Sequence, residues 1–381
     1  MKKTFLIFII IFQAVFFQVV NADNILPCAK SSIVMDVNTK RILYSNNAAV
    51  KLPMASTTKI MTVLLAIENG DLNDTVTVSK NASRQEGSSV YLKEGEKIRL
   101  DDLLYCVMLR SGNDAAVAVA EHISGSVEDF ARLMNNRAIA AGAKNTNFVN
   151  PHGLPDDNHY TTSYDLALIT SEALKNKVFA EIVKTKKHTV TELLDEKKYL
   201  ENKNKMLWQY PGGDGVKTGY TGKAGQCLVS SATKEDWQIL SVVLNCNDIW
   251  KGSTELLNYG FGNYENKKIV DKNKVIINVD IIKGKEKQIQ IIPEEDLYAP
   301  LKKIQEGYEK IDYIKKLPEE IKAPVKKDTK AGILEIYADK HLLGQVELIY
   351  NNDVESSDLF YHLKNIMDNF LLGQKQLNPI N

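Results

Sequence analysis

The chain has 381 residues, of which 44% are hydrophobic and 25% are charged, and its formal net charge is +0. This length allows two domains with hydrophobic cores. The balanced charge argues against the strongly basic composition that is typical of nucleic-acid-binding domains, so we expect no nucleic-acid partner.

Residues 1–22 have the pattern of a signal peptide. Lys2 and Lys3 precede an apolar run, and Val20-Asn-Ala22 supplies a small-residue cleavage site. An uncleaved anchor is the alternative, but the run is short for a membrane span and lacks a second charged flank. Cleavage would leave a mature net charge of −2. We therefore expect an exported protein on the extracytoplasmic face of the cell membrane, in the periplasm or on the cell-wall side.

The first part of the mature chain alternates like a β-hairpin and then becomes helical. Residues 33–37 and 41–45 flank a polar turn and predict two paired strands. Helical periodicity then extends to about Lys175, with helices expected over 127–141 and 163–173.

The motif Ser56-Thr-Thr-Lys59 lies where the first buried helix is expected to begin. Pro53 precedes it, and Gly70 follows the predicted helix 57–69. That helix is apolar nearly all round, which is typical of a buried helix. Ser56 and Lys59 are one turn apart, so their side chains should share a face. Ser56 as a mere helix cap is the alternative, but capping does not explain the buried lysine.

A second copy of the Ser-x-x-Lys pattern, Ser231-Ala-Thr-Lys234, fails the same test. It ends an alternating run rather than opening a helix. A polar turn follows it, so we interpret Lys234 as a solvated turn lysine.

The triplet Ser111-Gly-Asn113 lies between two apolar helical segments, 102–109 and 114–120. A tight loop between two buried helices can direct the Ser111 and Asn113 side chains into a site. The alternative is simple helix capping by Asn113 or Asp114.

The motif Lys217-Thr218-Gly219 occurs in a strand-like run with glycines, residues 215–221. Glycine in a strand often marks the close approach of another backbone or a ligand. A hairpin strand with an exposed lysine is the alternative. Further strands are expected at 226–233 and 238–245, followed by a helix over 253–259. With the early hairpin they suggest one antiparallel sheet, with the Lys-Thr-Gly motif on the edge that faces the helical half.

The composition changes after about residue 266. Several alternating runs predict a small β-rich domain over 266–352, which leaves 23–265 as the first domain. The tail, 353–381, predicts an amphipathic helix that lies on a membrane surface. Docking on the β-rich domain or on another subunit is the alternative. The apolar positions of this helix are Leu359, Phe360, Leu363, Ile366, Met367, Phe370 and Leu371.

Four cysteines are too few for a disulfide framework. Cys227 and Cys246 fall on two predicted neighbouring strands and could form a disulfide. Cys106 lies in the apolar helix before Ser111 and is expected to be a buried thiol. No Cys or His spacing indicates a metal site, and we expect no cofactor.

The three motifs together contain the groups that acyl transfer through a serine ester requires. A serine hydroxyl needs a base, and none of the six histidines stands in a pattern like the known Ser/His/Asp triads. Lys59 is the simpler candidate, because burial and the second cation Lys217 would lower its pKa. We expect Lys59 to take the proton of Ser56, and Ser111 to relay it to the leaving amine.

The other motif residues are expected to bind the substrate. The backbone N–H groups of Ser56 and Tyr220 would stabilise the oxyanion. Asn113 would bind a substrate amide, and Lys217 and Thr218 would bind a free carboxylate. A carboxylate beside the scissile bond indicates an exopeptidase or a β-lactam target.

The sequence resembles the low-molecular-mass penicillin-binding proteins, specifically the serine D-alanyl-D-alanine carboxypeptidases of peptidase family S11, over about residues 31–352. The resemblance implies an α+β fold. A β-lactamase/transpeptidase-like domain, with helices on both sides of an antiparallel five-stranded sheet, would precede a small β-rich domain. The segments that carry it are Ile33-Val-Met-Asp36, Leu52-Pro-Met-Ala-Ser-Thr-Thr-Lys-Ile-Met-Thr62, Leu109-Arg-Ser-Gly-Asn-Asp-Ala-Ala116, Pro151-His-Gly-Leu154 and Asp214-Gly-Val-Lys-Thr-Gly-Tyr-Thr221.

By this resemblance Ser56 is the nucleophile, Lys59 the base, Ser111 and Asn113 the second motif, and Lys217, Thr218 and Gly219 the third. The implied reaction removes the terminal D-alanine from peptidoglycan stem pentapeptides that end in D-Ala-D-Ala. Acylation by β-lactam antibiotics is implied as well. Relatives often use a tail helix to lie on the outer face of the cytoplasmic membrane.

Two other functions fit the same scaffold: a β-lactamase, and a non-catalytic wall-binding or penicillin-sensing protein. A β-lactamase needs a base for deacylation. Glu172 in Glu172-Ala-Leu-Lys-Asn176 mimics one, but we expect it within a helix. Some relatives place an arginine shortly before the third motif. Lys203 stands in that stretch here, and we expect it to be solvated.

Overall fold

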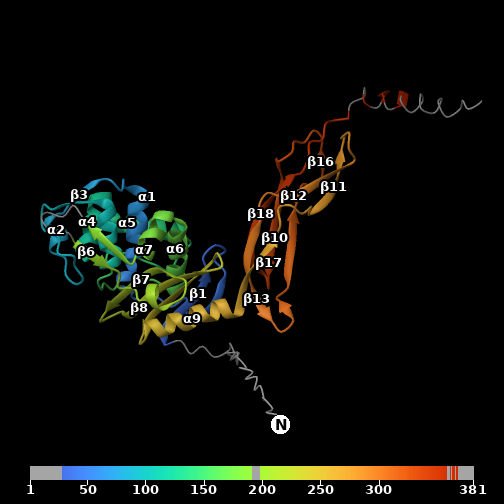
Figure 1. Cartoon of the computed structure of the whole chain (residues 1–381). Coiled ribbons are helices and arrows are strands. Elements are labelled where there is room, and N and C mark those ends of the chain that lie inside the picture. Colours follow the sequence, from blue (N-terminus) through green and yellow to red (C-terminus); the bar gives the residue numbers. More distant parts are fainter. Residues whose placement is uncertain (1–27, 191–197, 358–360, 362, 365, 368–381) are drawn as a thin grey trace, which may run out of the picture.

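The computed structural model describes residues 28–190, 198–357, 361, 363–364 and 366–367. The predicted signal peptide lies outside the described residues. Figure 1 shows a mixed helix-and-sheet lobe followed by an elongated lobe of strands. The predicted α+β fold class is therefore confirmed.

The first lobe is built on a five-stranded antiparallel sheet of order β2-β1-β9-β8-β7. Two strands come from the start of the lobe and three from its end, as predicted. The strand β7, which carries Lys217, is at the edge of the sheet. The bounds are β1 (Ala29–Asp36), β2 (Ile42–Asn46), β7 (Gly213–Thr221), β8 (Gly225–Lys234) and β9 (Trp237–Cys246).

Helices cover both faces of this sheet because successive strand residues point to opposite sides. Ile33 and Met35 pack into the larger core beneath most of the helices. Val34 and Leu43 pack with α9 (Ile249–Asn263) on the other face. The helices of the larger layer are α1 (Lys59–Asn69), α3 (Leu100–Leu109), α4 (Asn113–Ser124), α5 (Val127–Ala140), α6 (Ser163–Lys175) and α7 (Lys177–Lys184).

Short elements connect these layers. Two of them border the functional site described below, the 3₁₀ turn η1 before α1 and the helix α8 before β7. The bounds are η1 (Ala55–Thr58), α2 (Lys80–Ser83), α8 (Met206–Gln209), β3 (Thr75–Thr77), β4 (Lys97–Arg99), β5 (Lys187–Val190) and β6 (Lys198–Glu201).

The second lobe has its own hydrophobic core between a six-stranded and a three-stranded sheet. The six-stranded sheet has the order β15-β17-β18-β12-β11-β16, and the other β10-β13-β14. The bounds are β10 (Tyr264–Val270), β11 (Ile277–Ile282), β12 (Gln288–Pro293), β13 (Leu297–Ile304), β14 (Gly307–Tyr308), β15 (Ile311–Lys316), β16 (Ile321–Lys322), β17 (Lys330–Ala338) and β18 (His341–Tyr350).

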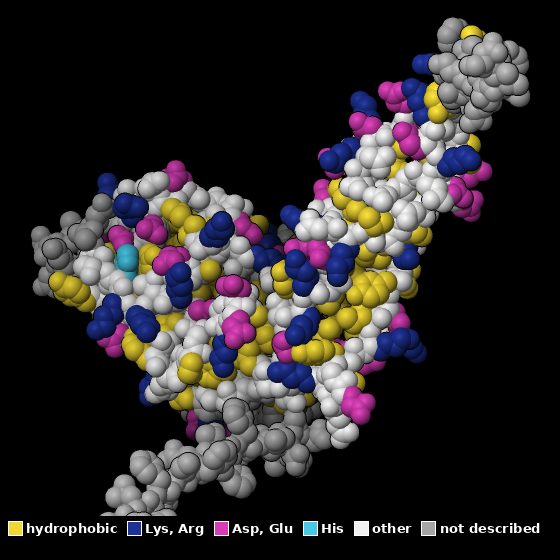
Figure 2. Space-filling view, turned by 45° about the vertical axis from the view of Figure 1, so that its right-hand side comes forward, with side chains coloured by type: hydrophobic (Ala, Val, Ile, Leu, Met, Phe, Trp, Pro, Cys, Tyr) yellow, Lys and Arg dark blue, Asp and Glu magenta, His cyan; other side chains and the backbone are white. Residues whose placement is uncertain are grey.

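A buried ion pair joins the two lobes. Arg41, at the start of β2, donates to both carboxylate oxygens of Glu309 at 2.6 and 2.7 Å and to the carbonyl of Pro300 at 2.6 Å. The helix α9 leads directly from the first lobe into β10 (Figure 1). Basic and acidic side chains are interspersed over the face in Figure 2, and hydrophobic side chains gather on the β-rich lobe.

The predicted pairing of Cys227 with Cys246 is wrong. Cys246 forms a disulfide with Cys28, which immediately precedes β1. Cys227 is buried in the larger core, whereas Cys246 packs on the opposite face of the sheet, so their side chains do not meet. Cys106 is buried, as predicted.

The described part of the tail, residues 361–367 without 362 and 365, is helical. Leu363, Ile366 and Met367 are 50%, 66% and 63% exposed. The other apolar positions of the predicted helix lie outside the described residues. In the part of the chain that the structure describes, no helix is long and apolar enough to cross a membrane.

We predict that Cys28→Ala lowers the free energy of unfolding by about 2–5 kcal/mol, because the disulfide closes a long loop. Adding Cys246→Ala should then cost little more, since the bridge is already lost. Chemical denaturation measures both effects, and peptide mapping without reductant should recover the Cys28–Cys246 peptide. Recovery of a Cys227–Cys246 peptide would contradict this pairing.

Candidate active site

Ser56 and Lys59 meet at the start of α1. Ser56 lies in the 3₁₀ turn η1, just before α1 begins at Lys59. Ala55 adopts a positive φ of 48°, which turns the chain sharply into this segment. The two side chains share one face, as predicted, and Lys59 Nζ is 3.2 Å from Ser56 Oγ.

Lys59 is fully buried and has three oxygen neighbours. Besides Ser56 Oγ, its Nζ lies 2.7 Å from Asn113 Oδ1 and 2.8 Å from the carbonyl oxygen of His152. Neither of the last two can donate a hydrogen to nitrogen, so each takes one N–H of the amine. A neutral amine then has one lone pair left, and it can accept the Ser56 hydroxyl proton.

The surroundings of Lys59 favour this neutral form. Burial lowers the pKa of Lys59 well below its usual value, and the nearby positive charge of Lys217 lowers it further. Asp114 opposes this effect and Lys203 adds to it, but both are smaller causes. Burial also lowers the pKa of Lys217 to about 7, with a further contribution from Lys203.

Ser111 lies on the tight loop between α3 and α4, and Asn113 is the first residue of α4. Ser111 has a positive φ of 64°. The Asn113 side chain accepts from Lys59 and donates to the Glu86 carbonyl at 2.6 Å, so it is not a helix cap. Asp114 accepts the N–H groups of Val90 and Leu92 as well as that of Ala115 in the first turn of α4, so it does more than cap the helix. It fixes the loop that borders the site.

The strand β7 passes directly beside the serine. A Cβ atom at Gly219 would stand 2.9 Å from Ser56 N and 3.1 Å from Thr57 N, so only glycine allows this approach. Lys217 is almost fully buried and donates to the Thr218 carbonyl at 3.1 Å. Tyr220, the next residue, is 70% exposed. The glycine thus brings the edge of the sheet against η1, as the sequence pattern suggests.

The segment Pro151–Leu154 closes the site behind Lys59. The His152 carbonyl accepts from Lys59, and burial lowers the pKa of the His152 side chain to about 3, so its ring is neutral. Gly153 has a φ of +90°, and a Cβ atom there would stand 1.8 Å from the Ala55 carbonyl oxygen. No other residue fits at this contact.

One cavity of about 530 Å³ gathers most of these groups. It is lined by Ser56, Ser111, Thr218, Gly219 and Tyr220, together with Ser88, Lys203, Gln226, Ile249 and Trp250. Lys203 was predicted to be a solvated lysine outside the site. The side chain is exposed, as expected, but it lies at the cleft. Ser88 and Trp250 were missed because they come from a loop and a helix start without a recognisable motif.

The rejected patterns lie elsewhere. Ser231 donates to Asp214 at 2.6 Å. Lys234 ends β8 and stands 4.5 Å from the centre of the Phe261 ring, so it packs on an aromatic side chain instead of being simply solvated. Glu172 lies on α6, as predicted, and pairs with Lys40 at 2.6 Å.

We predict that Gly153→Ala destabilises the fold by about 2–5 kcal/mol, because the methyl group meets backbone and the positive φ is strained. Gly95→Ala is the matched control, since Gly95 has a φ of +80° with nothing within 4 Å of its added Cβ. Thermal unfolding measures both. Equal losses in the two variants would mean that the contact with Ala55 is unimportant.

Comparisons with known proteins identify relatives over most of the chain. A family model described as D-alanyl-D-alanine carboxypeptidase matches residues 19–248, and one described as penicillin-binding protein 5, C-terminal domain, matches residues 264–356. The chain is 35% identical over 349 residues to the D-alanyl-D-alanine carboxypeptidase DacF of Bacillus subtilis (strain 168), covering 89% of each chain. It is 31% identical over 350 residues to DacA of Escherichia coli (strain K12), covering 87% of this chain and 85% of that one.

Among solved structures, penicillin binding protein 5 from Haemophilus influenzae is similar with a TM-score of 0.72 and 30% identity, over 87% of this chain and 99% of that one. The family model and the relatives extend over both the motifs and the second lobe. The chain therefore belongs to the D-alanyl-D-alanine carboxypeptidase family, peptidase family S11.

Proposed function

We propose that this protein is a serine DD-carboxypeptidase that removes the terminal D-alanine from peptidoglycan stem peptides ending in D-Ala-D-Ala. The observation that carries the proposal is the contact between Ser56 Oγ and a buried Lys59 amine at 3.2 Å. Family membership agrees with it.

Acylation begins when Lys59 takes the hydroxyl proton of Ser56 and the oxygen attacks the carbonyl of the penultimate D-alanine. The oxyanion is stabilised by the backbone N–H groups of Ser56 and Tyr220. The close approach of Gly219 to η1 supports this role, because it brings these two backbone segments to the same point of the cleft.

The terminal D-alanine leaves when its nitrogen is protonated. Ser111 relays the proton from Lys59 to that nitrogen, and Lys217 and Thr218 hold the terminal carboxylate. Asn113 binds a substrate amide, since its side-chain oxygen and nitrogen each retain one further hydrogen bond after their contacts to Lys59 and Glu86. Water then hydrolyses the Ser56 ester.

β-Lactam antibiotics acylate the same serine, because they present a strained amide next to a carboxylate. The surroundings of Glu172 favour a carboxypeptidase over a β-lactamase. Glu172, on α6, forms ion pairs with Lys40 and Lys175. It does not line the cavity that contains Ser56. The open cavity beside Ser56 favours an enzyme over a non-catalytic penicillin sensor.

We further propose that residues 1–22 are a cleaved signal peptide and that 23–265 form the catalytic domain. Residues 266–352 would form a β-rich domain that supports it. The protein would act on the extracytoplasmic face of the membrane. The exposed Leu363, Ile366 and Met367 support a peripheral membrane contact through 353–381.

We predict that Ser56→Ala abolishes labelling by a fluorescent penicillin and D-alanine release from diacetyl-L-Lys-D-Ala-D-Ala. Lys59→Met should lower both by about 10²-fold or more, because the general base is lost. Ser231→Ala is the control and should keep both activities. Labelling that persists in Ser56→Ala would rule out this nucleophile.

We predict that Lys217→Gln moves the acidic limb of the acylation rate to higher pH. Lys59 acts as the neutral amine, so the rate falls as the pH drops through its pKa. Removing the Lys217 charge removes a cause that lowers this pKa, and the pKa rises. Stopped-flow acylation by a penicillin over a pH series measures the shift. A limb that moves to lower pH would contradict the assignment of Lys59 as base.

A further inference from the structure

A second cavity adjoins the catalytic cleft. We propose that it binds the side chain of a leaving residue that is longer than alanine and ends in a carboxylate, as D-glutamate does. The inference rests on the proposed function and extends it to substrates of the form D-Ala-D-Glu.

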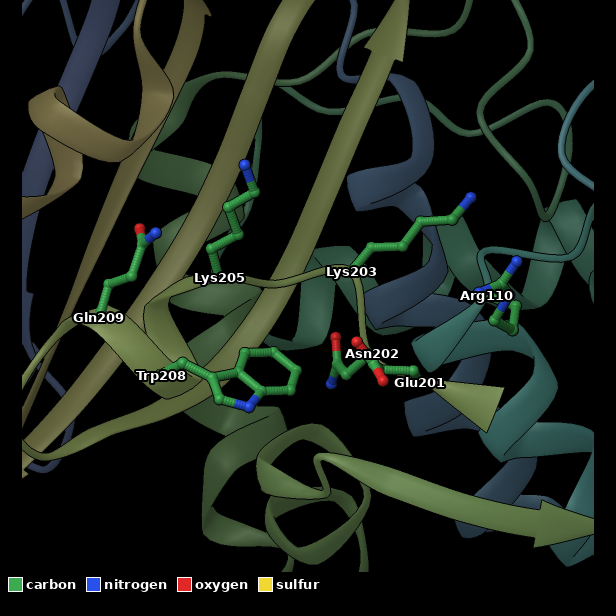
Figure 3. Close-up of a pocket in the computed structure, with 7 residues that line it drawn as sticks. All are labelled: Arg110, Glu201, Asn202, Lys203, Lys205, Trp208 and Gln209. Carbon is green, nitrogen blue, oxygen red and sulfur yellow. The ribbon is translucent and has the colours of Figure 1, made fainter. Parts of the chain in front are cut away.

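The cavity has a volume of about 490 Å³, within the range of small-molecule sites. Figure 3 shows the Lys203 and Lys205 side chains extending from one stretch of chain with their amines pointing apart, Arg110 on the side of Lys203 and the Trp208 ring below them. Its lining residues are Arg110, Glu201, Asn202, Lys203, Lys205, Trp208 and Gln209.

The stretch 201–205 is fixed by its buried members. The Asn202 side chain donates to the Thr185 carbonyl at 3.1 Å and accepts from Asn204 N at 3.0 Å, and the Asn204 side chain accepts from Met206 N at 3.1 Å. Because Asn202 and Asn204 are buried, the alternate residues Glu201, Lys203 and Lys205 are exposed at the cavity. Their positions are therefore set by the fold before any ligand binds.

The cavity continues the cleft on the side of the leaving group. Lys203 lines both cavities. Its backbone N–H donates to the Leu109 carbonyl at 3.3 Å, which fixes it beside the loop that carries Ser111. Arg110, the residue before Ser111, lines the second cavity. Since Ser111 protonates the leaving amine, a group beyond that amine points toward Arg110 and Lys203.

The charges of the cavity favour an anion. The cavity is lined by three cations, Arg110, Lys203 and Lys205, and by one carboxylate, Glu201, which pairs with Lys187 at 3.6 Å. Within the described ranges, no carboxylate lies within 4.0 Å of those three cations. Burial lowers the pKa of Lys203, and the positive charge of Arg110 lowers it further. A second carboxylate on the leaving residue would offset the repulsion between these two cations.

The size of the cavity favours an extended side chain. The Trp208 ring is 45% exposed and supplies an apolar surface for methylene groups. Lys186 stands 5.8 Å from the centre of that ring and adds a further positive charge nearby. D-Alanine itself, with a single methyl group, does not reach this surface.

The test compares diacetyl-L-Lys-D-Ala-X peptides with X as D-Ala, D-Glu, D-Gln or D-Lys. We expect kcat/KM for D-Glu to exceed that for D-Gln by about three- to tenfold at low salt, because two or three exposed ion pairs form. High salt should reduce this ratio. Failure to hydrolyse the D-Ala peptide would overturn the proposed function. Hydrolysis of D-Ala with equal rates for D-Glu and D-Gln would overturn only the second-cavity proposal.

Two variants assign the effect to this cavity. Lys205→Gln should lower the ratio of kcat/KM for D-Glu to that for D-Gln and leave D-Ala release unchanged. Lys205→Glu should make D-Lys a better leaving residue than D-Glu, a gain of activity that misfolding cannot produce. Lys144→Gln removes an exposed lysine outside both cavities and should change nothing. If Lys205→Glu keeps the wild-type preference, or Lys144→Gln alters it equally, the cavity does not bind the leaving residue.

Discussion

The site depends on a lysine amine that the fold buries with no counter-charge in contact among the residues that the structure describes. Burying an ammonium group is costly, and the usual response is a lower pKa that makes the neutral form accessible. Lys59 Nζ has three oxygen neighbours here. Two of them, Asn113 Oδ1 and the His152 carbonyl oxygen, can only accept hydrogen bonds. The third is the Ser56 hydroxyl, which can give up a proton to this nitrogen. In the proposed mechanism, this buried amine is the base and the serine beside it is the nucleophile.

Each layer of the first lobe supplies one wall around that amine. The turn η1 and the start of α1 present Ser56 and Lys59, the start of α4 presents Asn113, and the edge of the sheet presents Lys217. These segments are far apart in the sequence, and only the packed core brings them together. Gly219 and Gly153 each permit a close backbone approach to η1. Glycine is needed there because any side chain would push the walls apart.

Much of this arrangement could be predicted from local patterns. The helix after Ser56 is apolar nearly all round, and glycines occur in the strand-like run around Lys217, so both elements and their motifs were identified. Contacts made by the backbone carbonyl groups of Glu86 and His152 could not be predicted, because a backbone carbonyl is present at every residue and the sequence does not mark which ones bind a side chain. The Cys28–Cys246 disulfide was missed because it depends on which face of the sheet each cysteine occupies. The place of Lys203 and Lys205 at the second cavity could not be predicted, because it depends on the hydrogen bonds of the buried Asn202 and Asn204 side chains to the backbone.

The most direct measurement is the protonation state of the Lys59 amine itself. Lysine labelled with ¹⁵N at Nζ, assigned by comparison with Lys59→Met, reports it by NMR. The account predicts that this signal titrates well below the usual lysine range and that it belongs to a neutral amine under conditions where the enzyme acylates. A Lys59 signal that remains an ammonium throughout that pH range would contradict it.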